Sequence, residues 1–183
     1  MQYNNKTITK FVIGICLIIT TIVITFVITN THYNSQFRVT YSLDDRHNDQ
    51  EIIRVIDNAQ KYVYFAIYYF TRSNIADALI RAQKRGLVVW GITDAEASKG
   101  SNRDVLASLK KAGIAVETQK HQDGIMHLKV LVTDKAYASG SYNWTTSATE
   151  ANDEVLEIGT NKSVRQQYLD IVKRVLLVNQ DPI

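Results

Sequence analysis

The stretch HLKVLVTDKAYASGSYNWT, residues 127–145, joins a strand pattern to several polar residues and raises the question of function. Its first half alternates as a β-strand does, and successive side chains of a strand point to opposite faces, so His127 and Lys129 share one face. A polar turn, Gly140 to Asn143, follows soon after. An imidazole beside an ammonium group suits an anionic, phosphate-like ligand, because the lysine holds negative charge while the histidine attacks or moves a proton.

Around this stretch, apolar strand patterns alternate with amphipathic helix patterns. The expected strands cover residues 37–42, 62–70, 87–93, 114–118, 126–133, 137–141 and 155–159. The expected helices begin near residues 48, 75, 101 and 161, and the last of them points Val164, Tyr168, Ile171, Val172 and Val175 at the core. Alternating strands and helices of this length indicate an α/β fold, with a mixed β-sheet sandwiched by helices.

An apolar segment precedes this domain. Residues 11–29 carry no charge and are about long enough to cross a bilayer as a helix. Lys6 and Lys10 come before it, and the positive-inside rule then keeps the N-terminus cytoplasmic and the rest of the chain outside. A cleaved signal peptide is the alternative. We therefore expect an N-terminal hydrophobic helix at 1–30, as membrane anchor or signal, and an extracytoplasmic domain at 31–183, in the periplasm or cell envelope.

Composition narrows the class of protein. With 45% hydrophobic and 21% charged residues in 183, the chain is typical of a compact domain rather than a disordered one. Its one cysteine, Cys16, lies in the apolar segment, so the domain has no thiol for a disulfide or a thiolate metal site. The formal net charge of +3 includes Lys6 and Lys10, so the part beyond residue 30 carries +1, which says little about an anionic partner.

The spacing of the polar residues carries more information. His127-x-Lys129-x4-Asp134, followed by Gly140-Ser141-Tyr142-Asn143, resembles the HKD signature of the phospholipase D superfamily. Residues 66–71, 75–89 and 152–154 also resemble segments of the small, single-motif bacterial endonucleases of that superfamily. The resemblance implies a phospholipase D-like catalytic domain and a phosphodiesterase that needs neither metal nor cofactor, because its positive side chains replace the divalent cation of other phosphodiesterases.

The resemblance also implies roles for single residues. In the family, one histidine attacks phosphorus to form a phosphohistidine, and the histidine of a second motif protonates the leaving oxygen. This chain has one motif, so a homodimer sharing one active site is expected. His127 is then nucleophile in one subunit and general acid in the other, while Lys129 and Asn143 bind the phosphoryl oxygens. Ser141 supports them, and Glu154 hydrogen-bonds a histidine and sets its tautomer.

One feature departs from the family pattern. Five residues separate Asp134 from the Gly-Ser pair, where the family usually has six. If His127 and Lys129 are to face Asn143 and Ser141 across a hairpin, residue 127 pairs with 143 and residue 129 with 141, which leaves residues 134–136 as a three-residue loop. Asp134 then points away from the site by strand parity and braces the turn.

Three functions follow from these patterns. The first is an endonuclease that cuts DNA or RNA, with a basic flank that includes Arg72, Lys120 and Lys135. The polar loops at 96–104 and 120–124 favour it, because a lipid site needs an exposed apolar rim. The second is a hydrolase of membrane phospholipids, which the apolar N-terminal segment makes plausible. The third is a binding module that keeps the fold without turnover.

Overall fold

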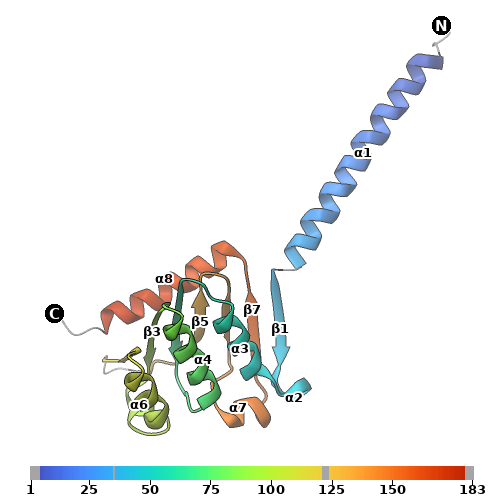
Figure 1. The fold of residues 1–183 in the computed structure, drawn as a ribbon. Coiled ribbons are helices and arrows are strands. Elements are labelled where there is room, and N and C mark those ends of the chain that lie inside the picture. Colours follow the sequence, from blue (N-terminus) through green and yellow to red (C-terminus); the bar gives the residue numbers. More distant parts are fainter. Residues whose placement is uncertain (1–4, 35, 121–123, 180–183) are drawn as a thin grey trace. The chain divides into compact units, whose positions relative to one another are not determined.

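A mixed β-sheet forms the centre of the domain in the computed structural model, which describes residues 5–34, 36–120 and 124–179, with backbone alone for 5–7, 29–34 and 45 (Figure 1). The described strands lie in the order β1-β7-β6-β5-β2-β3-β4. Their bounds are β1 Phe37–Tyr41, β2 Tyr62–Ile67, β3 Val88–Thr93, β4 Ala115–Thr118, β5 Lys129–Thr133, β6 Tyr137–Gly140 and β7 Val155–Gly159. Strands β2, β3 and β4 are parallel and the other neighbours antiparallel, which confirms the predicted mixed sheet.

Helices cover both faces of this sheet. The domain's helices are α2 Ser42–Asp45, α3 Asn48–Asp57, α4 Ser73–Lys84, α5 Ala95–Lys99, α6 Arg103–Lys111, α7 Thr146–Glu150 and α8 Lys162–Val178. Figure 1 shows α3 and α4 on one face and α8 on the other. Because β2 and β5 are buried between the two helical layers, β2 and the central residues 130–132 of β5 carry apolar side chains on both faces, as the unbroken apolar run from residue 62 predicts for β2.

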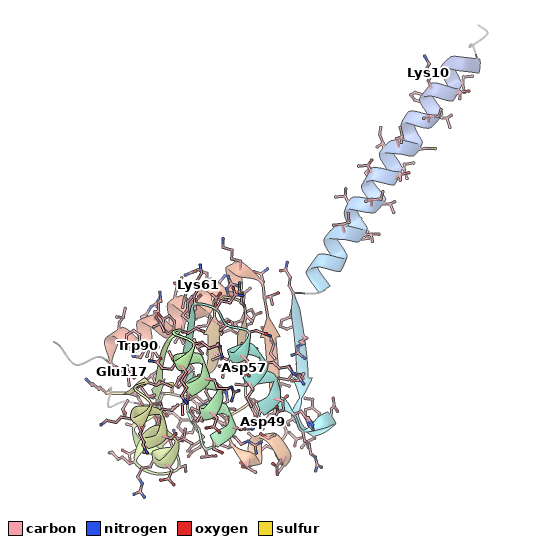
Figure 2. The ribbon with its side chains drawn as sticks, in the orientation of Figure 1. Lys10, Asp49, Asp57, Lys61, Trp90 and Glu117 are labelled. Carbon is pink, nitrogen blue, oxygen red and sulfur yellow. The ribbon has the colours of Figure 1, made fainter. Side chains whose placement is uncertain are left out.

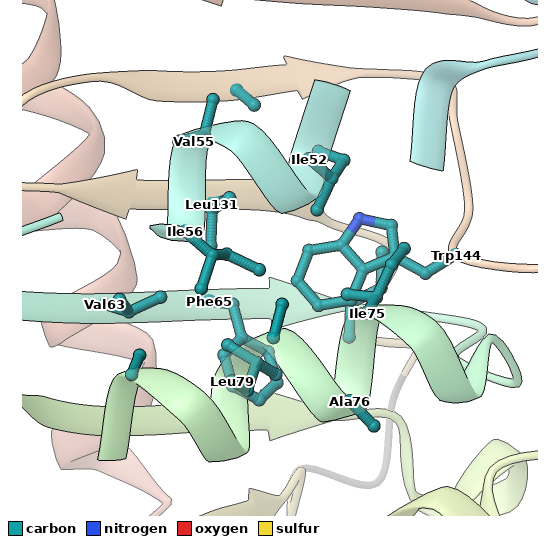
Figure 3. Close-up of a cluster of buried hydrophobic side chains, with 14 of the residues drawn as sticks. Ile52, Val55, Ile56, Val63, Phe65, Ile75, Ala76, Leu79, Leu131 and Trp144 are labelled. Carbon is teal, nitrogen blue, oxygen red and sulfur yellow. The ribbon is translucent and has the colours of Figure 1, made fainter. Parts of the chain in front are cut away.

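Each face has its own hydrophobic core. On the α3 and α4 face, Phe65, Ile56, Leu79 and Trp144 are almost completely buried and pack together (Figure 3). On the α8 face, the cluster contains Leu169, Val172 and Leu176, one helical turn apart. The predicted inward position of Ile171 is wrong, since its side chain is 41% exposed. The buried face of α8 is centred on Leu169, Val172 and Leu176, so it is rotated away from the predicted position of Ile171.

The strand ends define two edges of the sheet. At one edge, which we call the site edge, Ile67 pairs with Lys129, Gly140 with Leu156, and Tyr41 with Val155. At the other, the opposite edge, Val63 pairs with Thr133, Tyr137 with Gly159, and Phe37 also with Gly159. In Figure 2, Lys61 marks the opposite edge and Asp49, at the start of α3, the site edge.

The β5–β6 hairpin differs from the prediction. Val130 pairs with Ser139, so the loop holds two residues, Asp134 and Lys135, and the predicted pairing of 129 with 141 is wrong. The hydroxyl of Thr133 accepts from the N–H groups of Lys135 and Ala136, and these bonds close the shorter turn. Extended without a break, this register would set Ser141 opposite Leu128, whose side chain points away from that of Lys129.

Gly140 removes the conflict. Its φ of +145° is a conformation that favours glycine, and a Cβ there would lie 2.2 Å from the carbonyl oxygen of Val155. The strand therefore ends at Gly140, and Ser141 N–H donates to the Val155 carbonyl at 3.1 Å. Because the regular alternation stops at this residue, Ser141 and Asn143 still reach the side of the sheet where His127 and Lys129 lie.

Residues 1–36 form a separate unit, whose helix α1 spans Asn5–Asn34. It begins earlier and ends later than the predicted apolar segment at 11–29. Its section Ile8–Ile28 has a mean hydropathy of 3.0 and is the one described helix long and apolar enough to cross a membrane. Lys10, labelled in Figure 2, lies near its start. This length and composition fit both an anchor and a signal sequence.

Candidate active site

A hollow of about 500 Å³ opens at the site edge. It is lined by His127, Lys129, Gly140, Ser141, Asn143 and Glu154. These residues come from the segment before β5, the first residue of β5, the last residue of β6, the turn that follows it and the residue before β7. The fold thus brings together the five side chains that the sequence proposes as catalytic, although the first of them, His127, and the last, Glu154, are 27 positions apart in the sequence.

Lys129 is the charged centre of the hollow. Its side chain is largely buried, and its Nζ donates to the carbonyl oxygen of His127 at 2.9 Å, which leaves two protons for a ligand. Burial lowers the pKa of Lys129, and the negative charge of Glu154 opposes that shift. The Nζ also lies 5.2 Å from the ring centre of Tyr68, within the range of a cation–π contact.

His127 sits on a braced segment. Just before it, Met126 N–H donates to the buried carboxylate of Asp94 at 3.1 Å, and just after it, the Leu128 carbonyl accepts from Tyr68 N–H at 3.0 Å. The ring of Tyr68 meets the imidazole edge-on, with centroids 4.9 Å apart. The contacts fix the backbone on both sides of the histidine and limit the positions of its ring.

Asn143 has a defined amide orientation. Its Oδ1 accepts from Tyr69 N–H at 3.2 Å, so its amino group is the free end of the amide. No described residue accepts a hydrogen bond from that amino group. Asn143 therefore presents two N–H donors at the hollow, which suit an oxyanion.

Ser141 and Glu154 are bound to each other. The Ser141 hydroxyl donates to Glu154 and accepts from Val155 N–H at 3.1 Å, while the amide of Asn152 donates to the other carboxylate oxygen at 3.2 Å. Within one chain, Glu154 therefore bonds Ser141 and Asn152 rather than His127. A bond from Glu154 to the histidine of a second copy stays a prediction.

Asp134 and Lys135 lie at the opposite edge, away from the hollow. The Asp134 carboxylate accepts from the N–H groups of Gln60 and Lys61 at 2.8 and 3.0 Å, and Lys135 Nζ lies 3.7 Å from the same carboxylate. Burial alone would raise the pKa of Asp134, but these backbone hydrogen bonds outweigh it and lower the pKa. Asp134 braces the β5–β6 turn, and Lys135 does not line the hollow.

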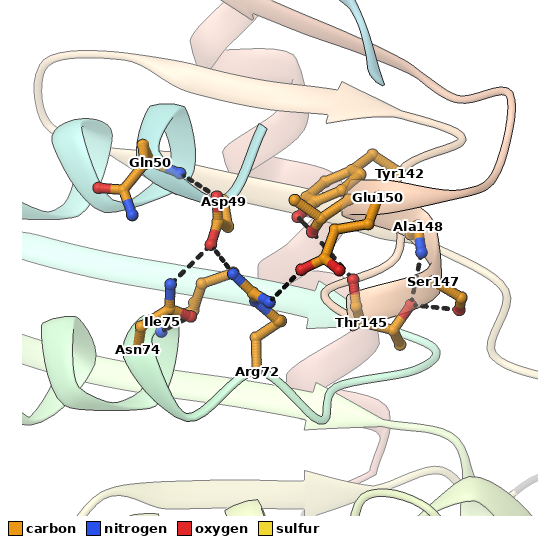
Figure 4. Close-up of polar contacts among 11 residues, drawn as sticks. Asp49, Gln50, Arg72, Asn74, Ile75, Tyr142, Thr145, Ser147, Ala148 and Glu150 are labelled. Atoms are coloured by element: carbon orange, nitrogen blue, oxygen red, sulfur yellow. Dashed lines mark hydrogen bonds and ion pairs between the residues drawn. The ribbon is translucent and has the colours of Figure 1, made fainter. Parts of the chain in front are cut away.

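Arg72 lies near the site edge but points into a polar cluster (Figure 4). Its guanidinium pairs with the carboxylates of Asp49 and Glu150, and Asn74 also donates to Asp49. Burial alone would raise the pKa of Asp49, but hydrogen bonds from Asn74 and Arg72 lower it. The structure therefore gives Arg72 a bridging role between α3 and α7, and it does not line the hollow.

Lys120 follows β4 at the site edge, and its backbone N–H donates to the side chain of Asn179 at 2.6 Å. Strands β2 and β3 lie between β4 and β5, and adjacent strands are about 4.8 Å apart, so Lys120 does not line the hollow. Of the three predicted substrate-binding residues, none is part of the hollow.

The sequence prediction missed the tyrosines beside the histidine. It assigned residues 62–70 to one strand, whereas β2 ends at Ile67 and Tyr68 and Tyr69 belong to the following loop. The buried side chain of Asn102 holds this loop, because it donates to the Tyr68 carbonyl and accepts from Phe70 N–H. Two adjacent tyrosines at the end of an apolar run were the available signal.

The arrangement suits phosphoryl transfer. An imidazole, a largely buried ammonium group and a free amide donor converge on one hollow, where negative charge on a phosphoryl group would be stabilised. Within the described residues, no group of three or more His, Cys, Asp or Glu side chains is placed to hold a metal ion.

Comparisons with known proteins agree with this fold. Residues 52–176 match the family model described as cardiolipin synthase, phospholipase D-like domain. A phospholipase D of Rickettsia conorii is 34% identical over 119 residues, 64% of this chain and 58% of that protein. A mitochondrial cardiolipin hydrolase of Xenopus tropicalis is 29% identical over 125 residues, 68% and 59% of the two chains. The chain thus spans less than two thirds of these curated relatives.

Two solved structures share the architecture. Nuc from Salmonella typhimurium, a phospholipase D family member, has a TM-score of 0.73 at 24% identity and covers 80% of this chain and 97% of its own. NucT from Helicobacter pylori has a TM-score of 0.69 at 26% identity and covers 79% and 98%.

Proposed function

The chain belongs to the phospholipase D superfamily, and on that premise we propose that it is a metal-independent phosphodiesterase that hydrolyses the backbone of nucleic acids, DNA or RNA. The observation that carries this proposal is the hollow in which His127, Lys129 and Asn143 converge. A phosphodiester needs these three groups: a nucleophile, a positive charge and donors for its oxygens.

In the first step, His127 attacks phosphorus. A P–N bond forms while the bond from phosphorus to the leaving oxygen breaks, and that oxygen takes a proton from a second imidazole. The two free protons of Lys129 and the amino group of Asn143 stabilise the charge on the equatorial oxygens. In the second step, the second imidazole takes a proton from water, which attacks phosphorus, and the P–N bond breaks.

The second imidazole comes from a second copy of the chain. His127 is the one histidine among the residues that line the hollow, and the reaction needs two. A two-fold homodimer would place both hollows around one phosphate. Heterodimers of wild-type and His127→Ala chains should then be nearly inactive. Full activity of a monomer at high dilution would contradict the shared site.

The polar surroundings of the hollow favour nucleic acid. The segment after Asn143 carries Thr145, at the N-terminus of α7, and Thr146 and Ser147 in its first turn, whose hydroxyl groups suit sugar and phosphate oxygens. Contacts of this kind carry no base information, so we expect little sequence preference. Cleavage should weaken as salt rises, because phosphate binding releases counterions.

A phospholipid substrate is the second candidate. Ile125, two residues before His127, is 55% exposed, and Val155, next to Glu154, is 48% exposed, so some apolar surface flanks the hollow. The curated relatives named above are a phospholipase D and a cardiolipin hydrolase. If α1 remains in the membrane, Lys10 at the start of the helix stays on the cytoplasmic side, and the domain is then held near lipid on the extracytoplasmic side.

An activity assay separates the candidates. The purified chain should cleave single-stranded or double-stranded DNA or RNA at low salt, with chelator present, and His127→Ala should abolish cleavage. Hydrolysis of phosphatidylcholine or cardiolipin vesicles with nucleic acids left intact would replace the nuclease by the phospholipase. Binding of nucleic acid without turnover of any substrate would instead identify a binding module, and strict dependence on added magnesium or zinc would contradict the mechanism.

A further inference from the structure

A row of aromatic rings leads away from the catalytic pair. The Tyr68 ring contacts both the His127 imidazole and the Lys129 ammonium group, as described above. The ring of Tyr69 lies next, with its centroid 4.2 Å from that of Tyr68. Tyr69 is 36% exposed, so part of its ring is available to a ligand.

The row ends at a second hollow of about 340 Å³. It is lined by Tyr69, Thr71, Ser101, Thr145, Thr146 and Ser147, so every lining side chain carries a hydroxyl group. The hydroxyls of Thr145 and Ser147 bond each other, and that of Thr145 also caps α7 (Figure 4). The hydroxyls of Thr71, Ser101 and Thr146 make no hydrogen bond within the described part of the chain.

The two hollows are joined by the backbone. Tyr69 lines the second hollow, and its N–H donates to the side chain of Asn143, which lines the first. The Tyr69 carbonyl accepts from Trp144 N–H at 3.0 Å, between Asn143 and Thr145. A ligand with its phosphate at Lys129 could therefore extend along the tyrosines into the hydroxyl-lined hollow.

The loop with Tyr68 and Tyr69, which we call the tyrosine platform, is held in place before any ligand binds. The Tyr68 carbonyl accepts from the amide of Asn102 at 2.9 Å and from the hydroxyl of Thr93 at 3.2 Å, and both of these side chains are fully buried. Phe70 N–H donates back to Asn102 at 2.8 Å. A ligand that stacks on Tyr69 would not have to order this loop, which reduces the entropic cost of binding.

We propose that the hydroxyl-lined hollow is a nucleoside subsite, in which the nucleoside next to the scissile phosphate stacks its base on Tyr69 and hydrogen-bonds its sugar to Thr71, Ser101 and Thr146. The proposal rests on the proposed nuclease function and narrows its substrate to one with a base and a sugar. Exposed aromatic rings bind bases of any sequence, because every base has a π-face. Six hydroxyl-bearing side chains offer a sugar more hydrogen-bond partners than an acyl chain could use.

Two substrates test the subsite. A short single-stranded oligonucleotide fills both hollows, whereas bis(p-nitrophenyl) phosphate has the phosphodiester without a nucleoside. Stacking contributes about 1–3 kcal/mol per base, and 1.4 kcal/mol is a factor of ten, so Tyr69→Ala should raise the KM for the oligonucleotide about tenfold. The kcat/KM for bis(p-nitrophenyl) phosphate should change less than about twofold, and Tyr69→Phe should behave like wild type with both.

Binding gives a readout that does not need turnover. In the inactive His127→Ala chain, adding Tyr69→Ala should weaken the Kd of a fluorescent oligonucleotide about tenfold, and adding Thr71→Val or Thr146→Val should weaken it by a smaller factor. An unchanged Kd would overturn the proposal. So would an equal loss of activity with both substrates in Tyr69→Ala, since the Tyr69 side chain would then only position the loop whose backbone N–H holds Asn143. Wild-type protein that cleaves the chromogenic diester and lipid vesicles but no nucleic acid would overturn both the subsite and the nuclease function. Wild-type protein that cleaves neither the diester, nor lipid, nor nucleic acid would overturn the proposed phosphodiesterase function itself.

Discussion

The two ends of β5 carry two lysines with different environments. At the site edge, Lys129 is 9% exposed, its pKa is lowered by burial, and two of its protons face a hollow shared with His127. At the opposite edge, Lys135 is exposed, and its ammonium group lies 3.7 Å from Asp134 in the turn. Lys129 belongs to the HKD signature and Lys135 directly follows its aspartate, yet only Lys129 lines the hollow.

The two ends of β5 differ in whether the polar groups around them already have hydrogen-bond partners. The site edge collects loops that leave donors unpaired, such as the amino group of Asn143. At the opposite edge, Asp134 accepts from the N–H groups of Gln60 and Lys61 and so ties the β5–β6 turn to the start of β2. The motif therefore combines residues that line the hollow with one residue that holds the hairpin.

Among variants that keep His127, the largest expected effect comes from replacing Lys129 with alanine. Lys129→Ala should lower kcat by about two to three orders of magnitude, the usual loss when a main charge stabiliser is removed. Lys135→Ala is the matched control and should change kcat by less than about twofold, since exposed ion pairs contribute little. Steady-state kinetics on one nucleic acid substrate measure both. Equal losses of kcat in the two variants would contradict the different roles given to Lys129 and Lys135.

Arg72 tests whether a basic residue near the site edge must bind substrate. Removing one partner of a buried ion pair costs about 3 kcal/mol, so Arg72→Ala should lower the free energy of unfolding by about that amount while leaving KM near the wild-type value. Chemical denaturation and kinetics give the two readouts. A raised KM with unchanged stability would restore the substrate-binding role predicted from the sequence.

The partner of Arg72 adds a pH dependence of stability. Because the pKa of Asp49 is lowered in the folded protein, its contribution is complete above the pKa of an unfolded aspartate, about 3.9, and is lost as the pH falls below that value. Denaturation curves at several acidic pH values should therefore show a steeper loss of stability for the wild-type chain than for Asp49→Asn.

Gly140 tests the break in β6 that brings Ser141 and Asn143 to the hollow. Gly140→Ala combines a positive φ with a Cβ too close to the Val155 carbonyl, and should destabilise the fold by about 2 kcal/mol and reduce kcat. Gly113→Ala is the control, since its φ is +80° but no atom lies within 4 Å of its Cβ, and it should cost about 1 kcal/mol with kcat unchanged. Equal effects in both would mean that the Val155 contact does not matter.

The smallest expected effect is a shift of the alkaline limb of activity. Lys129 must be protonated to stabilise charge, and burial lowers its pKa, so kcat should fall at a lower pH than an exposed lysine would require. Lys129→Arg keeps a charge that does not titrate in this range, so its kcat, although lower, should lack that limb. An alkaline limb at the same pH in both proteins would assign it to another group.

Much of the fold could be predicted from the sequence, because the domain buries apolar strands on both faces. The runs that became β2, β3 and β7 needed only local composition, and the signature predicted which side chains share the hollow. The register of the hairpin could not be predicted, since it depends on a two-residue turn held by Thr133 and on a break at Gly140. The tyrosine platform was missed because only tertiary bonds from Asn102 end the strand at Ile67.

The predicted basic flank of Arg72, Lys120 and Lys135 stays a prediction, since none of the three residues lines the hollow. Charge along a sequence does not indicate whether a side chain is already paired, and Arg72 is bound by carboxylates from α3 and α7. Lys135 follows the signature closely in sequence but lies at the other end of β5. A basic residue in the sequence therefore does not by itself indicate a place beside the hollow.

The most direct test of the account is a rapid quench of the wild-type reaction with a single-stranded oligonucleotide, followed by mass spectrometry under alkaline conditions that preserve a phosphohistidine. We expect a nucleotide adduct on the peptide that contains His127, formed and lost at rates consistent with turnover, and no adduct in His127→Ala. Turnover without any adduct, an adduct on another residue, or near wild-type cleavage by His127→Ala would contradict the claim that the site edge carries the nucleophile.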